Sequence, residues 1–393
     1  MAPTRDVVRA RWGVTLMFVL NGLGFAFLIP RFPEIKQSLG LGDLQWGVVV
    51  GLGPVGGLVA ALFTARLMRR FTSANVTVVA AVLAFASISV YGTARHWAVF
   101  ALGLLLISAC DALTDISMNS HALRVQRSYG TSILNGLHGW WSVGAVLGGF
   151  LGSLAAEARL PIGAQCVIAF VAFSAVAVYA RSLMLKGPDA RPSTDGARAH
   201  GRGIPRRWLP RLVALGLLGA AAGLIEDSSA SWGAVYLDAN FAVTPFIAGM
   251  GFVALHGVQM LARFTGDAIV NRVGPRVAVT QGVVIAAVGM GLAVAFPSVP
   301  LTLFGFACAG WGIATGIPMA MHAADELPGM AAGNGLTFVT WLLRVGFFFG
   351  PPLIGLVADG VGIRYALVVV PVAALVALLL TPSLTPPAKE SAG

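Results

Sequence analysis

Two carboxylates, Asp111 and Asp115, lie one helical turn apart in the apolar stretch LLLISACDALTDISMNSHAL, residues 104–123. Residues at i and i+4 share one face of a helix, and Asn119 extends that face by another turn. Two like charges this close in a low dielectric disfavour double ionisation, so one carboxyl is expected to hold a proton near neutral pH. Such a group has the chemistry that proton coupling requires. A hydrogen bond between helices, without titration, is the alternative.

A second acidic pair, Glu226 and Asp227, lies in the apolar stretch GLIEDSSASWGAVYL. Adjacent helical residues point about 100° apart, so one acid can face a cavity while the other pairs with a neighbouring helix. Arg344 lies in a third such stretch, WLLRVGFFFGPP. A guanidinium keeps its proton and must be paired or hydrated. It could neutralise Glu226 or Asp227, or bind an anionic solute through two parallel hydrogen bonds; both interpretations stay open.

Further polar and aromatic side chains inside apolar stretches could bond to or stack on a solute, although helix packing explains any one of them as well. These are Asn21, His138, Trp232, His256, Gln259, Trp311 and Trp341. The spacing of the histidines and of the three cysteines is not that of metal ligands, so no metal site is expected.

The elements that must position these residues are membrane helices. Of the 393 residues, 57% are hydrophobic and only 11% are charged, against about 25% charged in a soluble domain. About twelve apolar segments are long enough to cross a bilayer. They cover roughly 12–34, 44–64, 75–93, 98–121, 131–155, 162–184, 211–237, 245–265, 277–296, 301–322, 333–357 and 364–382. The sequence predicts an all-α membrane protein.

The positive charges predict the orientation. Of the 26 Lys and Arg residues, 20 fall at the termini or in the even-numbered loops, five on the other side, and Arg344 inside a span. This bias places both termini in the cytoplasm of a multi-pass protein of the bacterial cytoplasmic membrane. The net charge of +10 then reflects topology and the anionic inner leaflet, and no nucleic-acid partner is expected.

The spans divide six and six about a Gly-, Pro- and Arg-rich segment, KGPDARPSTDGARAHGRGIPRRW. We expect an N-terminal bundle at 1–185, a cytoplasmic linker at 186–210 and a C-terminal bundle at 211–393. The halves are alike: TARLMRRFTSA (64–74) and GDAIVNRVGPR (266–276) each join a second span to a third. A duplicated six-helix unit with a binding site between its copies is typical of transporters.

The layout resembles the major facilitator superfamily, whose fold is two pseudo-symmetric six-helix bundles and whose members are usually monomers. Its signature, Gly-x-x-x-Asp-Arg-x-Gly-x-Arg/Lys, is matched by Arg272, Gly274 and Arg276, while Asn271 takes the place of the acid and Asp267 lies one turn earlier. The resemblance implies a conformational latch formed by Asp267, Arg272, Gly274 and Arg276. The N-terminal copy departs further, with Arg69 and Thr72 at the acid and glycine positions.

Five stretches also resemble, in order and spacing, a group of poorly characterised bacterial carriers that is itself similar to fucose–proton symporters. They are RFPEI, DALTDISMNSHA, LHGWWSVGAVLGG, SWGAVYL and GPPLIGLVAD. In those symporters the acid of an acid-x-x-x-Asn pattern is a protonation site, which here implies Asp115 with Asn119. The group has an acid at the Glu226 position, so Glu226 is expected to face the cavity.

These patterns predict a proton-coupled secondary transporter that moves a small polar, sugar-like solute by alternating access. Asp115 and Glu226 would titrate, with Asp111 and Asp227 as further candidates. A proton-driven exporter of a drug-like amphiphile is the alternative. A membrane enzyme with an aspartate dyad and a non-transporting receptor are weaker hypotheses, because no nucleophile motif accompanies the dyad. No cofactor is expected, since GLGPVG (51–56) lies inside an apolar span and no phosphate-binding loop is present. The expected partners are the solute, protons and the lipid bilayer.

Overall fold

The protein is an all-helical membrane protein. A computed structural model describes the chain except for residues 1–3, 131–132, 188, 190–203, 329, 331–333 and 386–393 and the side chains of Asn135 and Asp267. Twelve helical segments in the described part are long and apolar enough to cross a membrane. The predicted fold class is therefore confirmed.

The first six spans are α1 (Arg5–Ala26) continued by η1 (Ile29–Arg31) and α2 (Phe32–Ser38), α3 (Asp43–Gly51) continued by α4 (Gly53–Phe71), α5 (Ser73–Gly92), α6 (Trp97–Tyr129), α7 (Leu134–Glu157) and α8 (Ile162–Leu183). The other six are α9 (Leu209–Ser228) preceded by η3 (Arg206–Trp208) and continued by η4 (Ser229–Gly233) and α10 (Ala234–Phe241), α11 (Pro245–Val273), α12 (Pro275–Ala295), α13 (Val299–Ile313) continued by α14 (Gly316–Asp325), α15 (Asn334–Val361), and η5 (Ile363–Val368) with α16 (Val369–Leu380) and η6 (Thr381–Leu384).

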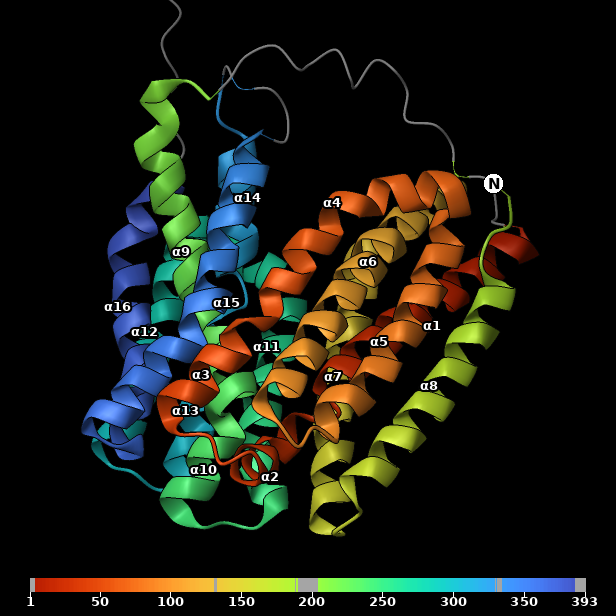
Figure 1. Ribbon diagram of the computed structural model, residues 1–393. Coiled ribbons are helices and arrows are strands. Elements are labelled where there is room, and N and C mark those ends of the chain that lie inside the picture. The colour runs from red at the N-terminus through yellow and green to blue at the C-terminus, as the bar shows by residue number, and fades with distance from the viewer. Residues whose placement is uncertain are drawn as a thin grey trace, which may run out of the picture.

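The spans gather into two groups that follow the two halves of the chain. Figure 1 shows α1, α5 and α8 on one side and α9, α12 and α16 on the other, with α3, α7 and α11 between them. Each half has its own buried hydrophobic cluster. The first cluster also takes in Trp232, Phe252 and Ile354 from the second half, so the halves are packed together over part of their length.

Glycines on α7 allow α1 to approach closely. A Cβ atom at Gly144, Gly148 or Gly152 would lie 2.1, 2.5 or 2.3 Å from a backbone oxygen of α1. Helices in lipid gain little from the hydrophobic effect, so small residues that permit close van der Waals packing hold them together. This packing fixes the two polar residues Asn21 and Trp141 beside each other.

The two ends of the molecule differ. We call the end that carries Thr72 and Gly274 the linker end, because the linker begins there: the Asp189 carboxylate accepts hydrogen bonds from Ser73 N–H and Oγ–H at 2.6 and 2.7 Å. The opposite end, which carries Arg31, is the far end. Arg31 is buried, and its guanidinium donates to the Gln165 side chain, to the Ala155 oxygen in the last turn of α7 and to the Leu160 oxygen in the α7–α8 connection.

The halves are in closer contact toward the far end. α15 packs along α3, where a Cβ atom at Gly51 would lie 2.7 Å from the Phe348 oxygen. Beyond the break at Leu52, α4 has few contacts with α15, and Leu62 on α4 is 80% exposed. The α3–α15 interface is therefore closed at the far end and parts toward the linker end.

Candidate functional site

A polar cluster joins three helices of the first half. The Asp111 Oδ1 atom accepts a hydrogen bond from Asn21 Nδ2 at 2.7 Å, and Asn21 Oδ1 accepts one from Trp141 Nε1 at 2.7 Å. All three side chains are half-buried. The Asp111 face of α6 is thus turned toward α1, into the protein rather than toward lipid.

Asp115 lies on the same face of α6 and is exposed, although it stands well inside a 33-residue helix. Asn119 Nδ2 donates to the backbone oxygen and to the Oδ1 atom of Asp115, both at 2.9 Å, and these bonds fix the Asp115 carboxylate. Asp115 thus presents a fixed and accessible carboxylate on the face of α6 that also carries Asp111.

Arg344 is half-buried and forms no hydrogen bond or ion pair with any residue that the structure describes. Neither of the two acids predicted as its partner pairs with it: Glu226 Oε1 lies 3.7 Å from Arg263 Nη2, and no ion pair joins Asp227 to Arg344. One turn along α15, Phe348 touches Gly51 of α3. Arg344 thus stands at the first turn beyond the closed part of that interface.

Arg263 connects the two halves and was not singled out from the sequence. It extends from α11 to Glu226 on α9, and its Nη1 donates to Ser142 Oγ on α7 at 3.4 Å. The apolar pattern predicted a span ending at residue 265, which puts Arg263 at a membrane surface. The helix continues to Val273, so Arg263 lies about 15 Å inside it. The pair Gly274-Pro275, a helix-stopping signal, could have located the true end.

Asp227 and the irregular turn after it form a second contact between the halves. Asp227 Oδ2 is buried without a hydrogen-bond partner among the described residues. The helix then widens into the π-turn η4, and such turns often mark functional sites. Within it, Ser231 Oγ donates to the Asp227 backbone oxygen at 2.9 Å, and the Ser231 oxygen accepts from Trp46 Nε1 of α3 at 3.1 Å.

Several predicted solute contacts are packed inside the protein in this state. Trp232 is fully buried and donates through Nε1 to the Pro351 oxygen at 3.1 Å. His256 is 3% exposed and stacks on Phe252 with ring centroids 3.9 Å apart. Gln259 is 1% exposed, and its Nε2 has no partner among the described residues.

Three other predicted solute contacts, His138, Trp311 and Trp341, are more accessible to solvent or lipid. His138 is exposed and meets the edge of the Phe18 ring, with centroids 5.3 Å apart. Trp311 and Trp341 are 36% and 64% exposed. Trp341 lines a hollow of about 500 Å³ on the second half, together with Ile204, Asn334, Thr337, Phe338 and Leu342.

The predicted latch is described in part. Gly274 has φ +83° and ψ 157°, and Thr72, at the corresponding place in the first half, has nearly the same conformation at φ +72° and ψ 151°. Arg272 and Arg276 are exposed, and Arg276 Nη1 reaches Thr385 Oγ1 at 3.5 Å. The Asp267 side chain lies outside the described residues. The two junctions thus share a backbone geometry that the sequence repeat only suggests.

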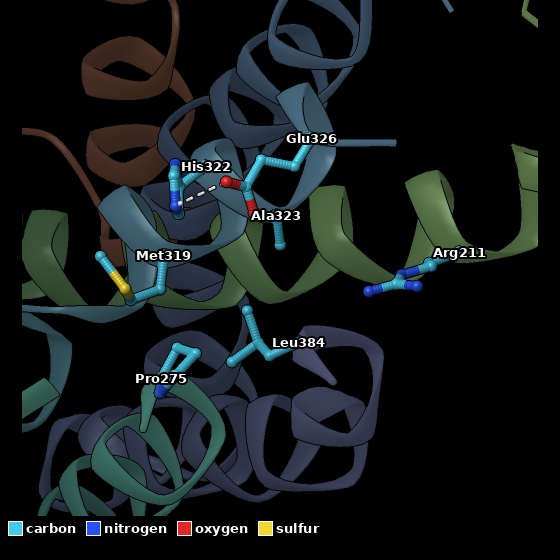
Figure 2. A pocket seen from close by; sticks show the side chains of 7 residues that line it. All are labelled: Arg211, Pro275, Met319, His322, Ala323, Glu326 and Leu384. Atoms are coloured by element: carbon cyan, nitrogen blue, oxygen red, sulfur yellow. Dashed lines mark ion pairs between the residues drawn. The ribbon is translucent and has the colours of Figure 1, made fainter. Parts of the chain in front are cut away.

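A hollow of about 410 Å³ lies at the linker end of the second half (Figure 2). It is lined by Arg211, Pro275, Met319, His322, Ala323, Glu326 and Leu384. None of the predicted solute or proton residues lines it, so it is separate from the candidate site. Among the described residues no group of three or more His, Cys, Asp or Glu could hold a metal ion.

Three relatives are similar over most of the chain, although no protein-family model matches it. An uncharacterised transporter of Sinorhizobium fredii is 29% identical over 371 residues, 93% of this chain and 96% of the relative. An uncharacterised MFS-type transporter of Yersinia pestis is 27% identical over 345 residues, 88% of each. The membrane protein MosC of Rhizobium meliloti is 26% identical over 358 residues, 90% of this chain and 85% of the relative.

Solved transporters share the fold. The nucleoside transporter NupG superposes with a TM-score of 0.73 and 14% identity, covering 97% of this chain and 98% of that one. A bacterial homologue of the human lysosomal transporter Spinster, inward-facing and unoccupied, superposes with a TM-score of 0.75, at the same identity and coverage. The chain has the major facilitator fold, and its relatives support a transport protein and not an enzyme.

Proposed function

We propose that the protein is a proton-coupled secondary transporter that moves a small polar solute by alternating access. The supporting observation is that charged side chains inside the spans lie where the two halves meet. Arg263 of the second half pairs with Glu226 and donates to Ser142 of the first half, and Arg344 is half-buried one turn from the contact between Phe348 and Gly51. A charged side chain at the centre of a bilayer costs about 2.5–3.5 kcal/mol even on the lenient scale, so such groups serve a function.

The moving parts in this proposal are residues 1–185 and 211–393, joined by the linker at 186–210. At the far end, two hydrogen bonds cross between them and have to break when that end opens. Trp46 Nε1 donates to the Ser231 oxygen, and Phe246 N–H, in the first turn of α11, donates to Glu157 Oε2 at 2.9 Å. With both termini cytoplasmic, the state seen here would be open toward the cytoplasm.

Protons act through the charge pairs in this scheme. Protonation of Glu226 would remove its attraction to Arg263 and leave the guanidinium with its bond to Ser142, across the interface between the halves. Protonation of Asp115 would likewise weaken its electrostatic interaction with Arg344. Each proton thus alters a charge close to the interface between the halves, which is what coupling to a rocking motion requires. Asp111 and Asp227 are further candidate sites.

The direction we propose is uptake, in keeping with the likeness of Asp115 and Asn119 to the fucose–proton symporters. The test uses vesicles that contain purified protein and an internal pH dye. Addition of a transported sugar or sugar acid outside should acidify the interior. Asp115→Asn and Glu226→Gln should abolish that acidification and preserve exchange of labelled for unlabelled solute. A signal of opposite sign would favour the exporter, and solute flux without any pH signal would refute proton coupling.

A further inference from the structure

The positively charged side chain of Arg344 has no anionic partner among the described residues. It carries five N–H donors and a permanent charge. It is half-buried inside a membrane span and forms no hydrogen bond or ion pair with the described residues. The nearest explanation, that it neutralises Glu226, is ruled out in this state because Glu226 pairs with Arg263.

Asp115 of the first half and Arg344 of the second both lie on the linker-end side of the closed part of the interface. Gly57 of α4 lies against Ala112 of α6, and Asp115 follows Ala112 by about one turn. On the opposite side Arg344 follows the Phe348–Gly51 contact by one turn. Arg344 thus lies one turn beyond the closed part of the interface, and Asp115 lies farther toward the linker end. The two side chains do not form an ion pair, which would need an N···O distance of 4.0 Å or less, so each of them can bind a different group of one solute.

The two sides offer different chemistry. A guanidinium binds a carboxylate through two parallel N–H···O bonds. An ionised Asp115, held in place by Asn119, accepts hydrogen bonds from hydroxyl or amino groups. A neutral sugar would leave the guanidinium without an anion, and a dianion such as a phosphate monoester would be repelled by Asp115. A singly charged molecule with an acid at one end and donors at the other satisfies both.

We infer that the transported solute is a small hydroxylated carboxylate, such as a sugar acid, whose carboxylate binds Arg344 and whose hydroxyl groups donate to Asp115. This inference rests on the proposed transport site. It adds the charge of the solute, which the resemblance to sugar carriers does not supply.

The test measures thermal stabilisation of purified protein by matched compounds: glucose with glucuronate and glucose 6-phosphate, sorbitol with gluconate, and inositol with quinate. The monoanionic acids should raise the melting temperature, with the neutral and phosphorylated partners at least about tenfold weaker in apparent affinity. Arg344→Gln should remove the preference for acids, Arg344→Lys should keep part of it, and Arg127→Gln, an exposed arginine at the end of α6, should behave as wild type.

Equal stabilisation by a neutral compound and its acid overturns the inference. So does a preference for acids that survives Arg344→Gln, or a panel in which no acid shifts the melting temperature. The thermal-shift measurement needs no proton gradient, so it tests the solute class independently of the proposal of proton coupling. Acid binding without proton flux refutes coupling alone, and proton-coupled flux of neutral sugars refutes the solute class alone.

Discussion

The hydrogen bond between Trp46 and Ser231 gives a quantitative prediction about access to the transport site. Trp46 is fully buried, and its indole N–H crosses from α3 to the π-turn of the second half at 3.1 Å. Trp46→Phe keeps an aromatic ring against Phe100 but leaves the Ser231 oxygen without this donor. A buried group that loses its partner costs about 1–3 kcal/mol.

That cost falls on the state closed at the far end, because the bond cannot survive separation of the halves there. A difference of about 1–3 kcal/mol shifts the ratio of two states by about 5- to 150-fold. Trp46→Phe should therefore raise the population open at the far end by a factor in this range. Trp232→Phe is the matched control, since Trp232 is equally buried and its bond to Pro351, also 3.1 Å, stays within the second half.

A single cysteine reports on this opening. Ser153 of α7 is fully buried at the far end, against Gly249 of α11. With Cys110, Cys166 and Cys308 replaced by alanine, the rate at which a maleimide labels Ser153→Cys in detergent follows the open population. Trp46→Phe should accelerate labelling at least about fivefold and Trp232→Phe should not. Equal rates in the two variants would refute the assignment of Trp46 to the far-end closure.

Three further predictions follow from single positions. Thr72→Gly should raise the unfolding free energy by about 1 kcal/mol, seen as a higher melting temperature, because a residue with a Cβ is strained at φ +72° and ψ 151°; a lower one contradicts the strain. Gly148→Val should lower stability by more than about 2 kcal/mol because its Cβ would lie 2.5 Å from the Leu23 oxygen, whereas Gly136→Ala, with open space around it, should not; equal thermal stability would disprove the α1–α7 packing argument. Arg263→Gln should slow proton-coupled flux at least about tenfold in the vesicle assay, with Arg263→Lys intermediate and exchange of solute less affected; unchanged flux removes Arg263 from the mechanism.

The features predicted from the sequence are those that a single segment determines. Length and apolar content locate the spans, since each must satisfy its own backbone in lipid. The spacing of Asp111, Asp115 and Asn119 places them on one face, because helical geometry leaves no other choice. Even a degenerate signature was enough to align Thr72 with Gly274, which share one backbone conformation.

The rest depends on contacts between distant segments. Trp46 and Ser231 are 185 residues apart, and nothing in the sequence around either residue indicates that the two form a hydrogen bond. The partner of Glu226 was missed because hydropathy ends a span where charge begins, while α11 continues through Arg263 to Val273. The π-turn at Ser229–Gly233 contains two Ser and one Gly, which are weaker helix formers than Ala, but this composition alone does not specify a π-turn.

The placement of that π-turn links the proposed proton sites Glu226 and Asp227 to the far-end closure through the backbone. Glu226 and Asp227 end the regular part of α9, and the turn that follows presents the Ser231 oxygen to Trp46. The Ser231 hydroxyl in turn donates to the backbone oxygen of Asp227. A change of charge at either acid therefore acts on residues one turn away from a hydrogen bond between the halves. The proposed coupling would need no long pathway, because the acids and the closure belong to one short segment of the same span.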